Sequence, residues 1–508
     1  MALARTTSVT LAGLEGCLVD VEADLATGLP GFVMVGLPDA ALSESRDRIR
    51  AAIVNSGLDW PSRRMTVALL PASVRKYGSH FDLALALAVL GAAEAVPVTA
   101  LAGVAVLGEL GLDGRVRSVR GVLPAVLAAA RAGLRRVLVP QPNAAEAALV
   151  SELDVRGVAS LADAVAWLRG EPADVLVGCP PTATDEPAGP DLADVAGQAV
   201  GRRAVEVAAA GGHNLFLLGP PGSGKTMLAE RLPGLLPPLD DAAALEVTAI
   251  HSVAGVLPAG APLIRCPPFE SPHHTASMAA LVGGGSGLAR PGAVSMAHRG
   301  VLFLDEAPEF SARSLDALRQ PLERGEVVLS RSHGVARYPS RCQLVLAANP
   351  CPCASAAGDQ ACVCAGSARR RYLTRLSGPL LDRIDLHVEL LPVTGADLLA
   401  EPGCAETSAV VAARVRAARA AAAERWSGTP WRLNADVPGS ALRTRWRLPA
   451  RTRRTADMAV DCGQLSARGY DRVLRVAWTV ADLAGRLVPD AGDVNTAVGL
   501  RTRVEVAA

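Results

Sequence analysis

The sequence predicts an α/β protein built around a parallel sheet, with a helical C-terminal part and a separate front domain. Apolar runs separated by helical stretches are typical of a parallel sheet, and here they occupy 214–218, 301–304 and 344–347. Beyond about Pro392 strand patterns fade, and alanine-rich helical stretches follow at 408–425, 449–464 and 470–487. We therefore expect a sheet-based core followed by a helical lid.

The chain length of 508 residues suggests roughly three domains. A proline-rich stretch is the clearest linker. In the region before it, a helix ending at Arg131 and a buried strand at 136–140 indicate an α+β or α/β fold. We expect a front domain at 1–170, a linker at 171–192, a core at 193–392 and a lid at 393–508.

Composition excludes some classes of protein. The net charge of +1 excludes a protein that holds nucleic acid by bulk positive charge alone. The longest apolar run, 83–93, is shorter than the about 20 residues that a membrane-spanning helix needs. The N-terminal residues lack the apolar core of a signal peptide, so we expect a cytoplasmic protein without a membrane partner.

The strongest motif follows the first central strand and includes one of only two lysines among 51 lysine and arginine residues. Its glycines let backbone N–H groups turn toward phosphate oxygens, and the following helix N-terminus favours an anion. The motif G-x-x-x-x-G-K-[ST] thus predicts ATP binding with Mg²⁺, although a plain glycine-rich turn is the alternative. The residues are Gly219, Pro220, Pro221, Gly222, Ser223, Gly224, Lys225 and Thr226.

Two carboxylates end the second central strand. We expect Asp305 to lie beside the metal and Glu306 to polarise the attacking water. Asn349 follows the third strand, where its amide can orient water or contact the γ-phosphate. A chance apolar run ending in Asp-Glu is the alternative, which the upstream motif disfavours.

Hydrolysis also needs positive charge on the departing phosphoryl group. Arg383 is a candidate arginine finger from a neighbouring subunit, and Arg468 is a candidate lid sensor, with Arg475 as the second choice. For each of them, a solvated surface position is the alternative interpretation.

Segments 272–310, 318–331, 346–353 and 372–390 together resemble the ComM/YifB family of magnesium-chelatase-like AAA+ ATPases. The resemblance implies a homohexameric ring that binds ATP between subunits, and a helicase that moves single-stranded or branched DNA during recombination. It also implies roles for the motif residues: Lys225 and Thr226 as Walker A, Asp305 and Glu306 as Walker B, Asn349 as sensor 1, Arg383 as the arginine finger and, more loosely, Arg468 as sensor 2.

The front domain resembles the Lon-protease fold, which is ribosomal S5-like, in segments 76–87 and 108–133. His80 stands at the position of the Lon serine, and Leu123 at that of the Lon lysine. Ser79 is adjacent but has no lysine partner in register, and a serine nucleophile needs a base within reach. We expect a degenerate protease-like domain that serves ring assembly or contact with DNA or a partner.

Four cysteines lie close together in the sequence. Four thiolates suit tetrahedral Zn²⁺ and predict a structural zinc site, while a redox disulfide pair and free thiols are the alternatives. The residues are Cys351, Cys353, Cys362 and Cys364.

Several segments are candidates for DNA contact. The better ones are 323–331, expected as a turn centred on Gly325 between hairpin strands, and the loop 283–290. The arginine-rich stretch 443–454 around Trp446 can grip phosphates and stack a base, but a solvated lid surface is the favoured interpretation.

For the arginine triplet 369–371, DNA contact and a solvated surface are again the two interpretations, and the solvated surface is again the favoured one. His273 and His274 either serve the same insert as the DNA-contact loops or are structural, and the structural role is the favoured one.

The leading hypothesis is an ATP-driven motor acting on DNA. The main alternative is a protein- or metallocofactor-remodelling ATPase of the magnesium-chelatase type. A scaffold that binds nucleotide without turnover is a third interpretation, against which the full set of catalytic residue types argues.

Overall fold

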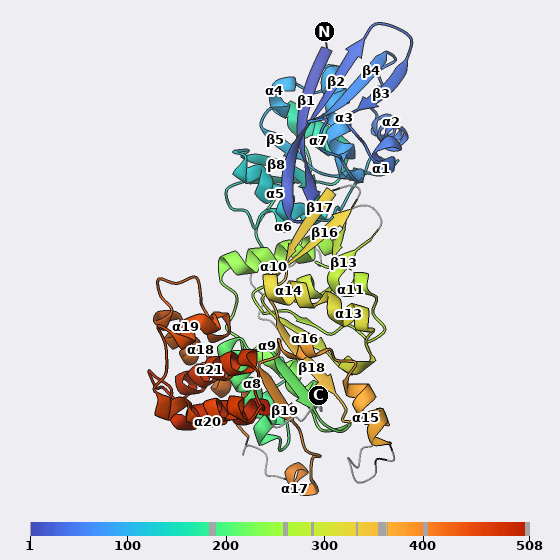
Figure 1. Cartoon of the computed structure of the whole chain (residues 1–508). Coiled ribbons are helices and arrows are strands. Elements are labelled where there is room, and N and C mark those ends of the chain that lie inside the picture. The colour runs from blue at the N-terminus through green and yellow to red at the C-terminus, as the bar shows by residue number, and fades with distance from the viewer. Residues whose placement is uncertain are drawn as a thin grey trace.

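The computed structural model describes residues 2–181, 189–257, 263–285, 289–331, 334–353, 362, 364–399 and 405–502. Figure 1 shows the front domain in blue at the top, the core in green and yellow below it, and the C-terminal helices in red beside the core. The predicted α/β fold class, with a parallel sheet and a helical C-terminal region, is confirmed.

The front domain is built on an eight-stranded mixed sheet. Its strands are β1 (Ala2–Ala12), β2 (Glu15–Ala26), β3 (Gly31–Val35), β4 (Arg64–Leu70), β5 (Val104–Val106), β8 (Arg136–Pro140), β9 (Asp154–Val158) and β10 (Val175–Val177). They are hydrogen-bonded in the order β10-β9-β8-β5-β1-β2-β4-β3. A separate short ribbon joins β6 (Glu109–Leu110) to β7 (Val116–Arg117). The predicted linker therefore begins inside this domain, because β10 pairs with β9.

Helices cover this sheet: α1 (Ala40–Ser43), α2 (Ser45–Asn55), α3 (Asp82–Ala92), α4 (Val98–Leu101), α5 (Val122–Arg131), α6 (Ala144–Ala147) and α7 (Leu161–Arg169). Every residue of α3 is buried, and the helix packs on β1 and β2. The long apolar run of the sequence is this helix, since a helix surrounded by protein is apolar on all faces.

The core is a five-stranded sheet in which every pairing is parallel. Its strands are β11 (Leu215–Leu218), β12 (Phe269–Glu270), β15 (Val301–Leu304), β18 (Gln343–Ala348) and β19 (Leu386–Glu389), and their order is β12-β15-β18-β11-β19. The three predicted strands are the three central ones, fully buried as their apolar runs require.

Ten helices and two ribbons surround the core strands in the described part of the chain. The helices are α8 (Ala199–Gly211), α9 (Lys225–Leu235), α10 (Asp241–Ala254), α11 (Met278–Val282), α12 (Ala293–Met296), α13 (Ala312–Ala317), α14 (Arg319–Arg324), α15 (Gly366–Leu373), α16 (Gly378–Leu381) and α17 (Gly395–Leu398). The ribbons pair β13 (Gly283–Gly284) with β14 (Arg290–Pro291), and β16 (Glu326–Arg331) with β17 (Gly334–Pro339).

The predicted turn at Gly325 is wrong in detail. Gly325 has φ +70° and ends α14, so it is a helix C-cap and not the tip of a hairpin. The hairpin strands both follow it, as β16 and β17.

The C-terminal helices are α18 (Ser408–Arg425), α19 (Gly439–Arg443), α20 (Ala450–Asp461), α21 (Ala467–Leu483) and α22 (Ala491–Thr502). The last predicted helix of the lid begins three residues early because Ser466 caps α21, its hydroxyl accepting the N–H of Gly469 at 3.1 Å. No helix in these described ranges has the length and apolar character needed to cross a bilayer.

The front domain docks on the β16–β17 ribbon and on α10 (Figure 1). Gly13, at the end of β1, forms a backbone bridge with Arg337, and a Cβ at Gly13 would lie 2.5 Å from the Arg337 carbonyl oxygen. Apolar side chains close the junction: Leu11, Leu14, Val253, Ala289, Leu329, Ala336 and Tyr338. The ribbon is thus packed against the front domain.

Candidate nucleotide-binding site

The phosphate-binding loop predicted from the sequence lies between β11 and α9. Gly222 and Gly224 have φ +77° and +84°, which only glycine adopts at little cost. Between them Ser223 is fully buried, and its hydroxyl has no hydrogen-bond partner among the described residues. The loop therefore has the backbone conformation and the unsatisfied polar atom expected of a site that closes around a bound anion.

Lys225 begins α9 and is 7% exposed. Its ammonium donates to the carbonyls of Gly219 at 2.7 Å and Pro220 at 2.9 Å, and to Oδ1 of Asn349 at 3.1 Å. Burial lowers the pKa of Lys225, and the nearby charge of Asp305 partly opposes this effect. These hydrogen bonds keep the ammonium inside the loop, where the phosphates of a nucleotide would lie.

Asp305 follows β15 and Asn349 follows β18, so the carboxyl ends of these two strands bring both residues close to the phosphate-binding loop. Thr226 donates its hydroxyl to Oδ2 of Asp305 at 3.0 Å, and Asn349 follows β18 and contacts Lys225. A hydroxyl and a carboxylate side by side supply the oxygen ligands that Mg²⁺ prefers. The residues present thus fit a nucleotide with its magnesium ion.

Glu306 has φ +48°, a conformation uncommon for a side-chain-bearing residue and frequent at functional sites. Its N–H donates to Oδ1 of Asp305 at 2.8 Å, and its side chain remains half-exposed. The Glu306 carboxylate Oε2 lies 3.2 Å from Nδ1 of His274. The histidine pair favoured as structural thus places one ring against the predicted catalytic carboxylate.

Tyr372 is a residue near the site that the sequence analysis did not single out. It lies on α15, and its hydroxyl oxygen faces the backbone N–H of Asn349. Burial raises the pKa of Tyr372 to about 12, and the charges of Glu309 and Glu306 act in the same direction. The phenol therefore stays protonated and supports the Asn349 backbone from the far side of the cysteine segment.

Arg383 lies at the opposite end of the parallel strands from the phosphate-binding loop. It precedes β19, which runs parallel to β11 with Leu386 beside Leu215, whereas the phosphate-binding loop follows the other end of β11. Its guanidinium donates to Oε2 of Glu323 at 2.8 Å and to the Pro379 carbonyl at 2.7 Å. The structure therefore does not bring Arg383 to the Lys225 site of its own chain.

Arg468 lies near Arg383. Its guanidinium is largely exposed and lies 3.6 Å from Asp382. Arg475, the alternative sensor, is largely buried and donates to the Val437 carbonyl at 2.7 Å, and burial lowers its pKa. Within the described chain neither arginine contacts the phosphate-binding loop. Of the two, Arg468 has the more exposed side chain.

The four predicted zinc ligands converge just beyond Asn349. Their Sγ atoms all lie within 4.8 Å of one another, with Cys351 and Cys353 at 3.0 Å and Cys353 and Cys362 at 3.5 Å. Tetrahedral zinc with bonds of about 2.3 Å separates its sulfurs by about 3.8 Å, so a small adjustment accommodates the ion. Hydrogen bonding from the Cys364 backbone lowers the pKa of Cys362 to about 6, which favours its thiolate. Residues 354–361 and 363 of this segment lie outside the described residues.

The arginine-rich stretch of the lid does not present its tryptophan to solvent. Trp446 packs edge-on against Trp426 with ring centroids 4.9 Å apart, and against Trp478 at 6.2 Å. Its indole N–H is buried. Because the ring belongs to the lid core, the solvated-surface interpretation fits this stretch better than base stacking. In the loop 283–290, residues 286–288 lie outside the described residues.

In the front domain, the Ser79 hydroxyl donates to the carboxylate of Glu109. His80 is partly buried, with Nε2 2.9 Å from the Val9 carbonyl oxygen, and Leu123 is fully buried in α5. The contacts of Ser79 in the described structure supply a carboxylate but no lysine, as expected for a degenerate protease-like domain.

Three family models match successive parts of the chain. The model described as magnesium chelatase, subunit ChlI, matches residues 191–398. The model described as subunit ChlI of Mg-chelatase matches residues 21–143, and the ChlI C-terminal model matches residues 405–501.

Full-length relatives extend this similarity. An uncharacterized protein of Mycobacterium tuberculosis is 56% identical and covers 99% of both chains. The Escherichia coli protein YifB is 42% identical over 93% of this chain and 91% of its own. Competence protein ComM of Haemophilus influenzae is 40% identical over 100% of this chain and 99% of its own.

A partial similarity connects the chain to Lon protease of Mycolicibacterium smegmatis. The two are 30% identical over 171 residues, which is 32% of this chain and 22% of the Lon protease. The similarity agrees with the predicted Lon-like fold of one domain.

Proposed function

This chain belongs to the magnesium chelatase ChlI family of AAA+ ATPases, in its YifB and ComM branch, and we propose that it is an ATP-driven ring motor that moves single-stranded or branched DNA. The main support is the arrangement of the site residues. Those of the loop and of the strand ends converge at the carboxyl ends of the parallel strands, while Arg383 lies at the opposite end.

Each residue of the converged site has a separate task in hydrolysis. Lys225 would exchange a carbonyl contact for the β- and γ-phosphates, and Thr226 with Asp305 would hold a magnesium ion, which would neutralise phosphate charge. Glu306 accepts a proton from the attacking water as the water oxygen bonds to the γ-phosphorus. The bond from that phosphorus to the bridging oxygen breaks, leaving ADP and phosphate, while Asn349 orients the water.

The position of Arg383 supports a ring. A guanidinium at the far edge of the sheet completes a site only on a neighbouring copy, and head-to-tail contacts that close by rotation produce rings. Arg468 lies beside the same edge and would approach the same neighbouring nucleotide. A homohexamer is the number that the family resemblance implies.

Two variants test this arrangement. Lys225→Ala removes the phosphate ligand within one chain, and Arg383→Ala removes the group supplied to the next chain. Each variant alone is expected to hydrolyse ATP poorly, whereas mixing them restores about a quarter of the interfaces. Failure of the mixture to recover any activity would contradict shared sites.

DNA is proposed as the substrate because two ribbons, β13–β14 and β16–β17, interrupt the core on its front-domain side, and because the ComM relative is named a competence protein. Binding through phosphates should weaken with salt and depend little on sequence. The test is ATPase rate with single-stranded, forked and no DNA, together with strand displacement. Stimulation by a protein partner and by no DNA would favour the protein- or metallocofactor-remodelling alternative.

Zinc is proposed as a structural ion held by Cys351, Cys353, Cys362 and Cys364, whose thiols already cluster. It would close the segment between Asn349 and α15, and so hold the predicted sensor in place. Cytoplasm is the compartment proposed, because it keeps thiols reduced and supplies ATP.

A further inference from the structure

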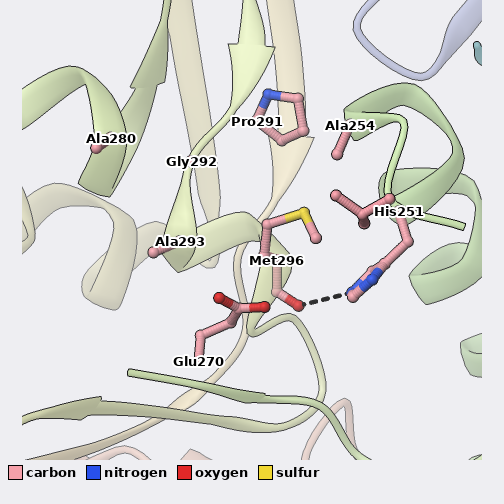
Figure 2. Close-up of a pocket in the computed structure, with 9 residues that line it drawn as sticks. His251, Ala254, Glu270, Ala280, Pro291, Gly292, Ala293 and Met296 are labelled. Carbon is pink, nitrogen blue, oxygen red and sulfur yellow. Dashed lines mark hydrogen bonds between the residues drawn. The ribbon is translucent and has the colours of Figure 1, made fainter. Parts of the chain in front are cut away.

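An open cavity of about 390 Å³ lies between the edge of the core sheet and the β13–β14 ribbon (Figure 2). Glu270, of the edge strand β12, lines one side of it, and Pro291, of β14, lines the other. Small and apolar side chains supply much of the remaining wall, among them those of Ala254, Ala280, Ala293 and Met296. Pockets for small ligands measure roughly 300–1,000 Å³, so the cavity is large enough for a planar ring.

The carboxylate of Glu270 lines this cavity without a partner. Glu270 is partly buried, and in the described part of the chain it has no hydrogen-bond donor and no ion-pair partner. Burial raises the pKa of Glu270, because the carboxylate loses hydration and gains no contact in return. A ligand that donates an N–H to this oxygen would remove the cost of that burial.

His251, on the α10 side of the cavity, adds a second acceptor. Its Nε2 lies 3.1 Å from the Met296 carbonyl oxygen, and because a carbonyl only accepts, Nε2 carries the proton. Burial lowers the pKa of His251, which favours the neutral ring with an unprotonated Nδ1. Both polar side chains of the wall can therefore only accept further hydrogen bonds, and they suit a ligand that carries N–H groups.

A positive charge lies beside the cavity on the ribbon. Arg290 precedes Pro291 in β14, and its side chain is exposed and has no ion-pair partner among the described residues. An arginine or lysine from another protein would satisfy Glu270 but would be repelled by Arg290. A nucleotide satisfies both, because its phosphate is an anion and its base carries neutral N–H donors. The pattern of charge therefore favours a nucleotide over a cationic side chain.

We propose that the cavity takes one base of the DNA strand that the β13–β14 ribbon engages, and that it prefers bases with an exocyclic amino group. Arg290 binds the backbone phosphate, the ring of the base lies against the apolar wall, and the amino group donates to Glu270. Cytosine and adenine have this amino group, whereas thymine has a carbonyl oxygen that the carboxylate repels. The inference rests on the proposed DNA motor, and phosphate contacts still supply most of the affinity.

The test measures binding of the full chain to single-stranded oligonucleotides of equal length that contain only deoxycytidine or only deoxyuridine. The two bases differ in the amino group and lack the thymine methyl group, so the comparison isolates the proposed hydrogen bond. Fluorescence anisotropy with a non-hydrolysable ATP analogue is expected to give a Kd about fivefold lower for the deoxycytidine strand. Glu270→Leu removes the acceptor and is expected to make the two Kd values equal.

Two further variants separate the cavity from general effects of charge. Glu326 lies on the other ribbon, where it pairs with Arg337 at 3.3 Å. Glu326→Gln removes a negative charge outside the cavity and is expected to change both Kd values by the same factor. Ala280→Phe fills part of the cavity and is expected to abolish the preference with Glu270 intact, so it tests the proposal even if Glu270→Leu impairs folding.

The outcomes distinguish the inference from the function on which it rests. Equal affinity of the original chain for the two strands would overturn the base pocket and leave the DNA motor standing. A preference that persists in both Glu270→Leu and Ala280→Phe would show that another part of the chain reads the base. Failure to bind either strand would overturn the proposed function together with the inference.

Discussion

Lys76 and Lys225, the only two lysines of the chain, show how the same buried group serves different ends in two domains. Both are nearly or fully buried, and burial lowers the pKa of each. Lys76 donates to three backbone carbonyls, those of Gly36 at 3.2 Å, Leu69 at 2.9 Å and Pro71. Lys225 shares its donors between two loop carbonyls and a side chain.

The difference lies in what surrounds each ammonium. The three donors of Lys76 are all used by carbonyls just after β3 and at the end of β4, so the ammonium is a structural cross-link within the front domain. Lys225 begins α9 directly after the glycine-rich loop and near Asp305 and Glu306, and there we expect a phosphate to replace a carbonyl. A buried lysine therefore indicates a binding site only where its partners can be exchanged.

The largest effect is expected from Lys225→Ala. Removing the ammonium from the phosphate site should lower ATP hydrolysis by about a hundredfold or more, with the thermal unfolding temperature nearly unchanged. Steady-state ATPase and a thermal melt measure the two quantities. Hydrolysis that remains near the original rate would make this lysine a structural one, like Lys76.

The cysteine cluster should have a smaller effect on the same site. Cys353→Ser, or removal of metal by a chelator, is expected to lower hydrolysis about tenfold, because the Asn349 backbone loses its support. Metal analysis of the reduced protein should give about one zinc per chain. The exposed Cys462 lies outside the cluster, and Cys462→Ser is the matched control.

Lys76→Met should affect stability instead of catalysis. It leaves three carbonyls without their donor, and we expect a loss of about 3 kcal/mol in the free energy of unfolding. The ATPase rate per folded molecule should stay near the original. Denaturant unfolding followed together with ATPase separates the outcomes, and a selective loss of hydrolysis would contradict the contrast between the two lysines.

The smallest effect is expected from Ser79→Ala. This change removes one hydrogen bond to Glu109, worth about 1 kcal/mol, and should leave ATPase and DNA stimulation unchanged. A peptidase assay on unfolded protein substrate should show no cleavage before or after the change. Cleavage that disappears in the variant would show that the front domain retains a serine nucleophile.

The sequence predicted the parts of the site that are local. The glycine-lysine loop, the carboxylates after β15 and Asn349 after β18 all follow strands whose apolar runs are plain, and parallel strands bring their ends together. The short edge strand β12 has only two residues and gives no such pattern.

Contacts between distant segments were the part that the sequence could not predict. His274 meets Glu306 across 32 positions, and Tyr372 reaches Asn349 from beyond the cysteine segment. Such pairs depend on how loops fold back over the sheet edge, which no periodicity encodes. The hairpin was misplaced for a related reason: glycine serves equally well as a turn residue and as a helix cap.

The glycine at the end of β1 gives the front domain a mechanical property. Gly13 rests on Arg337 with no side chain between the two backbones, and β1 extends away from it for 11 residues, about 37 Å. β1 can therefore pivot about the contact between Gly13 and Arg337 of the ribbon. A tilt of a few degrees about this contact would displace the far end of β1 by about 2–3 Å.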